Sequence, residues 1–429
     1  MQLPLILPPI QSQRYDCHGC TNCCRELVVQ LTAFDRDNID RQNWAGELST
    51  KPYIRLGRNH VLNQTPDGCC VFLSDDGKCR IHARHGPTAK PLACQLYPFT
   101  LEADAQGLRV GIRFDCPSVA RNDGNPLPTH RSNLAHLASA FTEALPSAHR
   151  ASESPLELVR GHPVSAKAVD LLLDLIHRWL GDTKRPLHHR VIGLHELVRT
   201  LGEARLNRFD DNRIIELVRL LMSDMPALAG EQAAAPMSPP TDRQSRLLRQ
   251  AVFVHCEHLS VREVGASFPK TLVYRWDQLR RARRMAAGHG AIPRLGPLDV
   301  GSDFEAFQRV EADPNLPTQP CDSLMTRYLE QRVACRTAFG PAYYGWPILD
   351  GLQSLLLAVA VIGWLARCLA VAGGRSVYGF DEIVRAVGLV DRTAGRAPGL
   401  GAASARLRLR YLTQNQGLLS LIRAYPIVP

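Results

Sequence analysis

The sequence lacks the motifs that identify several large classes of enzyme. No Gly-x-Gly-x-x-Gly motif follows a strand-like run and no P-loop is present, so neither a Rossmann-type nucleotide or S-adenosylmethionine site nor a P-loop nucleotide site is visible. The Cys-x3-Cys-x2-Cys spacing of radical S-adenosylmethionine enzymes is also missing. No internal repeat of solenoid period occurs, which excludes the common repeat architectures.

Lysine is scarce. Only six of the 51 lysines and arginines are lysine, so the formal net charge of +10 comes mainly from arginine. Scattered arginine is typical of a solvated surface, and we expect no nucleic-acid partner. The strongest basic run lies between Arg275 and Arg284. We interpret it as a solvated helix face, with docking of an acidic protein or of nucleic acid as the alternative.

The sequence also lacks a clear export or membrane signal. Residues 1–10 are apolar, but they contain three prolines, no basic stretch and no small-residue cleavage site, so we expect a cytoplasmic protein. The longest apolar run, Leu352–Ala372, contains Gln353 and Arg367. Its uninterrupted part is shorter than the roughly 20 residues that span a bilayer. We therefore predict a buried core helix and no membrane contact.

A chain of 429 residues, 45% hydrophobic and 21% charged, has ordinary globular composition and is long enough for two or three domains. We predict a mainly α fold with a small irregular α+β cysteine-rich N-terminal metal-binding module. The expected division is a module at 1–125, a helical domain at 126–230 and a C-terminal helical domain at 241–429. The alanine- and proline-rich stretch Glu231–Pro240 is interpreted as a linker.

Periodicity places the secondary structure. Short strands are predicted at Leu27–Leu31, Val71–Leu73 and Leu108–Phe114. Thr32 and Asp35 predict a capped helix start between the first two strands. Longer helices are predicted at Ser165–Leu180, Pro186–Leu206, Asp210–Met225, Arg243–Leu259, Leu324–Ala338, Ile348–Ala372, Phe380–Val387 and Ala402–Tyr425.

Cysteine is abundant in the N-terminal part of the chain. Nine of the 13 cysteines fall within the first 116 residues, and the group begins as Cys17-x2-Cys20-x2-Cys23-Cys24. Clustered thiols in a reducing compartment indicate a metal or an iron–sulfur cluster. Cys-x2-Cys spacing lets two sulfurs converge on one soft metal. Neighbouring side chains diverge, so we expect Cys23 and Cys24 not to bind the same ion.

The later cysteines stand in distinctive settings. They occur as Gly68-Cys69-Cys70-Val71-Phe72-Leu73, Gly77-Lys78-Cys79-Arg80-Ile81, Ala93-Cys94-Gln95-Leu96-Tyr97-Pro98-Phe99 and Asp115-Cys116-Pro117. Residues 14–120 thereby resemble the CxxCxxCC cysteine-cluster family of zinc- or iron-chelating proteins. The long form of that family includes the flagellin lysine N-methylases, which residues 324–372 resemble only loosely.

The resemblance implies metal ligands at Cys17, Cys20, Cys23, Cys24, Cys70, Cys79, Cys94 and Cys116. It implies a [4Fe-4S] cluster, with zinc as the alternative. It further implies S-adenosylmethionine as methyl donor and a flagellin-like protein substrate whose lysines are methylated. The chain departs from the family in the additional Cys69 and in Lys90 and Gln95, where arginines are usual.

Several alternatives remain open from the sequence. The module could be a non-catalytic zinc site with a helical interaction scaffold, or an iron–sulfur redox carrier. Cys69 is the best candidate for a cysteine that only packs. We interpret His82 and His85 as surface residues rather than metal ligands. We expect no metal site in the run His255–His258. Cys321, Cys335 and Cys368 are expected in the core, and no catalytic residue can be named.

Overall fold

The chain folds into two units, and the first of them contains the cysteine-rich segment. The computed structural model describes residues 4–7, 10, 12–104, 106–144, 155–204, 206, 209–236, 238–257, 263, 268–414 and 416–427. One unit comprises Met1–Leu7, Gln11–Ala151 and His258–Arg280, and the other comprises Pro8–Ile10, Ser152–Glu257 and Arg281–Pro429. The three-part division expected at 1–125, 126–230 and 241–429 stays a prediction.

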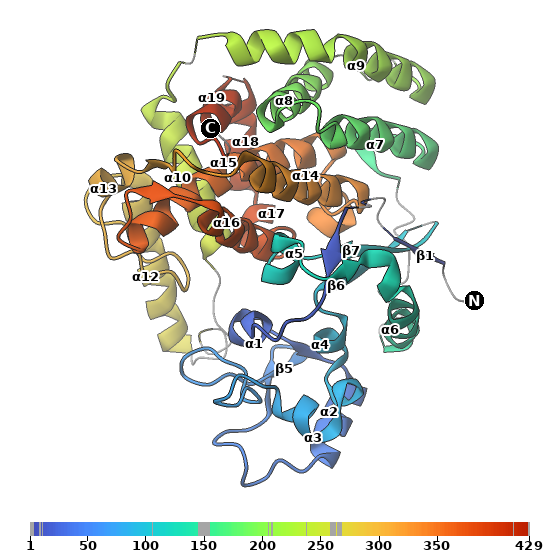
Figure 1. Ribbon diagram of the computed structural model, residues 1–429, viewed down its shortest axis with the longest axis vertical. Helices are drawn as coiled ribbons and strands as arrows, with labels where there is room; N and C mark the ends of the chain where they lie inside the picture. Colours follow the sequence, from blue (N-terminus) through green and yellow to red (C-terminus); the bar gives the residue numbers. More distant parts are fainter. Residues whose placement is uncertain are drawn as a thin grey trace. The chain divides into compact units, whose positions relative to one another are not determined.

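Small sheets organise the first unit (Figure 1). Strands β6 (Phe99–Asp104) and β7 (Gly107–Ile112) form an antiparallel hairpin, and β1 (Leu5–Ile6) adds to β7 in parallel. Strand β2 (Arg14–Tyr15) pairs antiparallel with β8 (Asn125–Pro126). A third sheet has the order β3 (Gln30–Leu31), β5 (Asn59–Leu62), β4 (Tyr53–Leu56).

Short helices connect these strands. They are α1 (Asn22–Glu26), α2 (Ala33–Arg41), α3 (Arg80–His85), α4 (Leu92–Leu96), α5 (Pro117–Arg121) and α6 (Arg131–Ala144). The predicted helix start is confirmed: the Thr32 hydroxyl accepts from the Asp35 amide and the Asp35 carboxylate accepts from the Thr32 amide. This capping box satisfies two amides that a helix start leaves free.

Of the three strands predicted in this unit, one is confirmed, one is shorter than predicted and one is wrong. The strand at Leu108–Phe114 is confirmed as β7, and the one at Leu27–Leu31 survives only as the two residues of β3. The strand predicted at Val71–Leu73 is wrong. Val71 and Phe72 lie in a turn, buried against Ile39 and Trp44. Their apolar character comes from core packing, which periodicity over three residues cannot separate from a strand.

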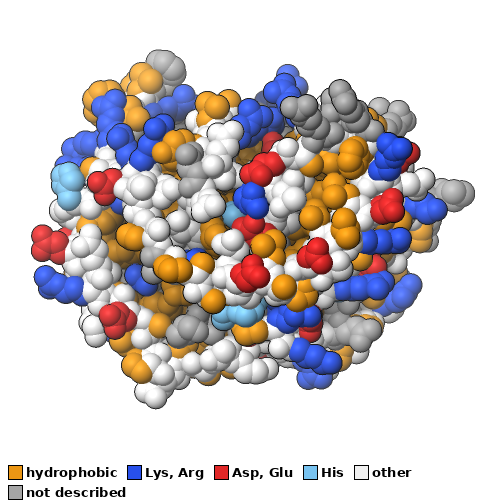
Figure 2. Space-filling model, turned by 90° about the horizontal axis from the view of Figure 1, so that it is seen from above, with side chains coloured by type: hydrophobic (Ala, Val, Ile, Leu, Met, Phe, Trp, Pro, Cys, Tyr) orange, Lys and Arg blue, Asp and Glu red, His pale blue; other side chains and the backbone are white. Residues whose placement is uncertain are grey.

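The second unit is helical. Its main helices are α7 (Ala166–Gly181), α8 (Leu187–Glu203), α9 (Asp211–Ala234), α10 (Asp242–Cys256), α14 (Thr318–Ala334), α15 (Ile348–Ala372), α16 (Phe380–Thr393), α18 (Ala403–Gln414) and α19 (Gly417–Ala424). Helix α7 lies where a helix was predicted at Ser165–Leu180, and it buries Val169, Leu172, Leu173, Ile176 and Leu180. The mainly α fold with a small α+β module is therefore confirmed. In Figure 2, one face of the molecule interleaves basic, acidic and apolar side chains.

Helix α15 forms the centre of the second unit and packs against α8, α10, α16, α18 and α19. Within the described residues it is the one helix long and apolar enough to cross a membrane, and 89% of its most apolar window is buried. The prediction of a buried core helix is confirmed. Its polar Arg367 donates to the carbonyl of Ala424 and lies over the ring of Tyr425.

Two boundaries differ from the predictions. Helix α9 continues past Pro226 to Ala234, into the stretch interpreted as a linker. Alanine favours helix, so the helix ends only near Pro236. The single helix predicted at Ala402–Tyr425 is divided into α18 and α19, with Gln416 in the left-handed region at φ 50°. A residue in that conformation cannot continue a right-handed helix.

Candidate metal centre

The opening cysteine motif is a tight turn followed by one turn of helix. Cys17 follows strand β2, and Gly19 and Thr21 take left-handed φ values of 67° and 61°. Cys17 and Cys20 are exposed, whereas Cys23 and Cys24 are half-buried in α1. Two left-handed residues in five reverse the chain repeatedly, which keeps four sulfur atoms within a short stretch of backbone.

The adjacent pair Cys23 and Cys24 does not diverge as expected. Their sulfur atoms lie 3.9 Å apart. Four thiolates at about 2.3 Å from zinc would place neighbouring sulfurs at roughly 3.8 Å. The two sulfur atoms are therefore closer than expected, and binding of Cys23 and Cys24 to different ions stays a prediction. The α1 helix tilts both side chains in the same direction along its axis.

Three later cysteines lie against one hydrophobic core. Cys70, Cys79 and Cys94 all pack on the cluster formed by Ile39, Trp44, Leu62, Val71, Phe72 and Ile81. The amide of Cys70 donates to the carbonyl of Cys24 at 2.7 Å, which joins this group to the opening motif. Cys79 directly precedes α3, and Leu73 forms a β-bridge with it. Segments far apart in sequence thus bring sulfur to one side of the core.

Electrostatic coupling supports the same grouping. Burial raises the pKa of the Cys94 thiol well above its ordinary value, and the charges of Cys70, Cys23 and Cys79 raise it further. Burial also raises the pKa of Cys70 to about 12. The hydrogen bond to Cys24, followed by burial, raises the pKa of Cys23. Lys90 acts in the opposite direction on Cys23 and on Cys94. These thiols are therefore neutral at pH 7 unless a cation offsets their burial.

A second group of cysteines forms where β2 meets β8. Tyr15 pairs with Asn125, and the Asp16 amide donates to the Asp123 carbonyl at 3.0 Å, so Cys17 starts beside the end of α5. Cys116 directly precedes α5. Burial raises the pKa of Cys116 to about 11, and the charge of Cys20 contributes. Burial raises the pKa of Tyr15, and the charges of Cys17, Cys116 and Cys23 raise it further. The second group is therefore Cys17, Cys20 and Cys116, and Cys23 adjoins it.

A polar network holds Cys116 in place. Asp115, whose side chain is fully buried, forms an ion pair with Arg113 and accepts from the Tyr97 hydroxyl at 3.2 Å. The Asn22 side chain donates to the Asp115 carbonyl at 3.0 Å, which connects α1 to this loop. Arg113, Asp115 and Tyr97 are not among the site residues predicted from the sequence. The signal available for them was an acid directly before a cysteine.

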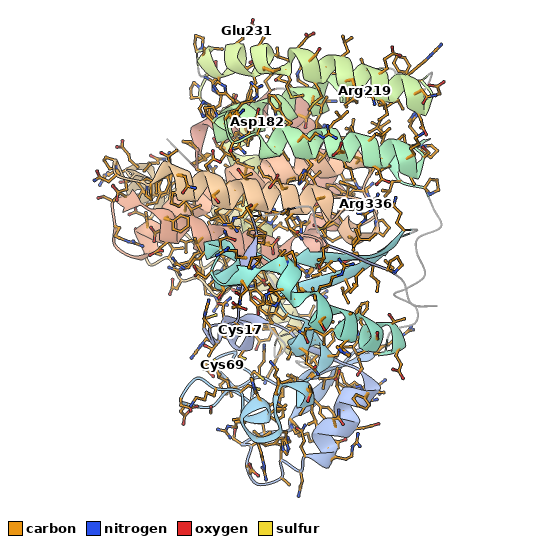
Figure 3. All side chains as sticks on the ribbon, turned by 45° about the vertical axis from the view of Figure 1, so that its right-hand side comes forward. Cys17, Cys69, Asp182, Arg219, Glu231 and Arg336 are labelled. Atoms are coloured by element: carbon orange, nitrogen blue, oxygen red, sulfur yellow. The ribbon has the colours of Figure 1, made fainter. Side chains whose placement is uncertain are left out.

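The predicted ligands thus lie in one unit as two adjoining groups, and Cys23 lies near members of both. Figure 3 shows Cys17 close to α1 and Cys69 on the neighbouring loop of the module. In the part of the chain that the structure describes, no three His, Cys, Asp or Glu side chains are arranged as a metal shell. Thiolate is the ligand that zinc and iron–sulfur centres prefer, so the donor set fits such a centre.

The other candidates lie outside these groups. The thiol of Cys69 donates to Asp67 at 3.1 Å and lies 3.6 Å from the Arg25 guanidinium. His82 and His85 are exposed, in agreement with the surface interpretation. His255 is buried and contacts Thr393.

Further predictions concern side chains away from the module. His258 lies outside the described residues, and Glu257 is occupied by Arg281. Cys321, Cys335 and Cys368 are buried, which confirms the core prediction.

Gln95 has a local structural role beside Cys94. Its side-chain amide donates to the carbonyls of Thr88 and Lys90 at 3.0 and 2.6 Å. These bonds fix the turn that precedes α4 and Cys94. Gln95 thus closes the loop without adding charge, and Lys90 is the cation beside the thiols.

Fold and thiol groups together define a cysteine-rich chelating module joined to a helical unit. Residues 16–113 match the model of the CxxCxxCC family, described as "Putative zinc- or iron-chelating domain". The match includes seven of the eight predicted ligands and ends just before Cys116. No curated protein and no solved structure matches the chain.

Proposed function

We propose that the N-terminal module is an iron–sulfur centre. The observation that carries the proposal is that Cys70, Cys79 and Cys94 pack on one core while the Cys70 amide binds the Cys24 carbonyl. Cys23 or Cys24 with Cys70, Cys79 and Cys94 would supply four thiolates, the number that a [4Fe-4S] cluster takes. Such a cluster would supply electron transfer or a Lewis-acidic iron. Cys17, Cys20 and Cys116 would form a second thiolate group or support the first.

Zinc is the second candidate. The sulfur separation of 3.9 Å between Cys23 and Cys24 is close to an edge of a zinc–thiolate tetrahedron. A zinc module would hold the unit together without redox chemistry, and the helical unit would then serve as an interaction scaffold.

Lysine methylation is the finer proposal, and its support is the resemblance to the flagellin lysine N-methylases. In this proposal the protein transfers the methyl group of S-adenosylmethionine to a lysine of a protein substrate. The amine must be deprotonated and aligned with the sulfonium carbon, and the released products are methylated lysine, S-adenosylhomocysteine and a proton. The proposed compartment is cytoplasmic. A redox carrier without a substrate site is the alternative.

Anaerobic purification tests the metal. A brown protein with about four irons and matching sulfide per chain supports the cluster. A colourless protein with stoichiometric zinc removes the cluster and the redox carrier together. The paired variant Cys79→Ser/Cys94→Ser should lose the centre, and Cys69→Ser, its matched control, should retain it. Cys17→Ser/Cys20→Ser shows whether the second group holds its own metal.

S-adenosylmethionine binding separates the methylase from the carrier. Calorimetry on the metal-loaded chain should detect binding if the methylase proposal is correct. Mass spectrometry of a flagellin substrate should then show methyl additions on lysine. Absence of binding by a fully loaded protein would reject the methylase and leave the carrier.

A further inference from the structure

Helix α12 (Phe268–Ala287) exposes an unusual number of large apolar side chains. Among the described residues, five of the ten exposed large hydrophobics belong to this helix. Val273 and Trp276 are each 67% exposed, Leu272 is 52% exposed and Leu279 is 44% exposed. Single exposed apolar residues are normal, but a group on one element indicates an interaction site.

These side chains form a continuous stripe. Leu272, Trp276 and Leu279 are spaced i, i+4 and i+7, so they lie on one face of the helix, and Val273 lies at its edge. We call Leu272, Val273, Trp276 and Leu279 the apolar stripe. It extends over about two turns, a length that one helix or extended segment of another protein could cover.

Two arginines lie on the same face of α12 as the apolar stripe. Arg280 follows Trp276 by four residues and Arg283 follows Leu279 by four, so both lie beyond the C-terminal end of the stripe. The helix contains six basic residues and a single acid, Asp277, which pairs with Arg280 at 3.5 Å on the exposed surface. An acidic partner would therefore complement this face.

The helix is anchored at its other end. Met285 and Ala286 are buried, and Arg249 donates to their carbonyls at 3.1 and 2.9 Å. Arg281 points to the anchored side, where it pairs with Glu257. These contacts fix the C-terminal turns of α12.

We propose that the apolar stripe with Arg280 and Arg283 is a docking surface for an acidic segment of another protein. The segment would carry two or three apolar side chains followed by carboxylates. Arginine suits this role because its fork binds a carboxylate through two hydrogen bonds.

The order of residues favours a protein over a membrane. A helix lying on a bilayer keeps apolar residues on one side and basic residues on the other along its whole length. In α12 the apolar and basic residues follow each other along one face. If a second copy of the chain bound with its α12 parallel to this one, its Arg280 and Arg283 would lie opposite the same arginines of the first copy.

Peptide selection tests the proposal on the full-length, metal-loaded chain. A random 16-residue phage library is selected against the wild type and then depleted on the stripe variant Leu272→Ser/Trp276→Ser. Leu220→Ser is the matched control, since Leu220 is 62% exposed on helix α9. Stripe-dependent peptides with apolar residues followed by acids support the proposal. Peptides recovered equally by both proteins, or stripe-dependent peptides without acids, overturn it.

Affinity measurements on a selected peptide provide the second test. Trp276→Ser should weaken binding roughly thirtyfold, and Arg280→Ser/Arg283→Ser at least about tenfold, with a reduced salt dependence. Trp44, Trp179, Trp346 and Trp364 are buried, so quenching of Trp276 fluorescence by acrylamide reports the stripe directly. An unchanged affinity in both variants would overturn the proposal.

Two further measurements distinguish the other occupants. Stripe-dependent sedimentation with phosphatidylserine vesicles, in the absence of peptide binding, would assign a membrane surface and reject a protein partner. Stripe-dependent dimerisation in analytical ultracentrifugation would assign a second copy. Since neither the stripe nor Arg280 and Arg283 contacts the thiol groups in any described interaction, metal content should remain unchanged in every variant.

Discussion

Asp35 is the residue whose replacement should most clearly detach the cysteine segments from each other. One oxygen of its carboxylate accepts from the amide and hydroxyl of Thr32, and the other accepts from the amide of Leu92 at 2.9 Å. The side chain therefore joins the start of α2 to the start of α4, which carries Cys94. Asp35 is buried, at 4% exposure, so water cannot readily replace it.

The size of the effect follows from these bonds. Loss of a helix cap costs about 1 kcal/mol, and a buried amide without a partner costs about 1–3 kcal/mol. Asp35→Ala should therefore lower the free energy of unfolding of the module by about 3 kcal/mol. Asp35→Asn retains one acceptor oxygen and should lose about half as much.

Hydrogen exchange followed by mass spectrometry is the appropriate assay, because a chain of two units need not unfold in a single step. Protection of the α4 amides should fall by about a hundredfold in Asp35→Ala, and metal retention during dialysis should fall with it. Asp37→Ala on the exposed side of α2 is the control. Unchanged α4 protection in Asp35→Ala would refute the claim that this carboxylate holds the Cys94 segment.

Three further predictions concern the helical unit. Burial raises the pKa of Glu330 to about 7, so the folded protein holds a proton there that the unfolded chain loses above about pH 4.5. The free energy of unfolding should fall by up to about 3 kcal/mol between those pH values, and Glu330→Gln should remove this decline. Arg190→Met should cost about 3–5 kcal/mol, because it leaves Asp322 without its buried partner. Gly363→Ala should lower Tm, since an added Cβ would lie 2.1 Å from the Tyr425 carbonyl oxygen.

Thermal and urea unfolding of the chain check these three predictions. For Glu330, the free energy of unfolding is compared with Glu330→Gln across this pH range. If both proteins lose stability in parallel as the pH rises, the carboxyl does not hold a proton and the prediction is wrong. For Arg190, Asp322→Asn is the companion variant, and the double variant should cost less than the sum of the two single changes. For Gly363, replacement of the open Gly230 by alanine is the control and should leave Tm unchanged or slightly higher. A similar Tm for both glycine variants would contradict the packing claim.

Helices were predictable where the apolar pattern was long and capped. Helix α15 has the predicted bounds Ile348 and Ala372, and α7, Ala166–Gly181, is within one residue of the predicted bounds at each end. Errors occurred where short apolar runs serve the core rather than a strand, as at Val71 and Phe72, and where proline occurs inside a helix, as at Pro226. In both cases the outcome depends on tertiary contacts, which the local sequence pattern does not contain.

The identity and spacing of the candidate metal ligands come from the sequence alone, because thiol chemistry and the Cys-x2-Cys interval are local properties. The helical character of the remainder has the same origin, since apolar periodicity is also local. Only the tertiary structure assigns Cys70, Cys79 and Cys94 to one group and Cys17, Cys20 and Cys116 to another. That assignment depends on a shared core and on the pairing of β2 with β8, both of which join residues distant along the chain. Exposure of the α12 stripe is likewise a tertiary property, because an apolar side chain lies in water only when no other part of the fold covers it.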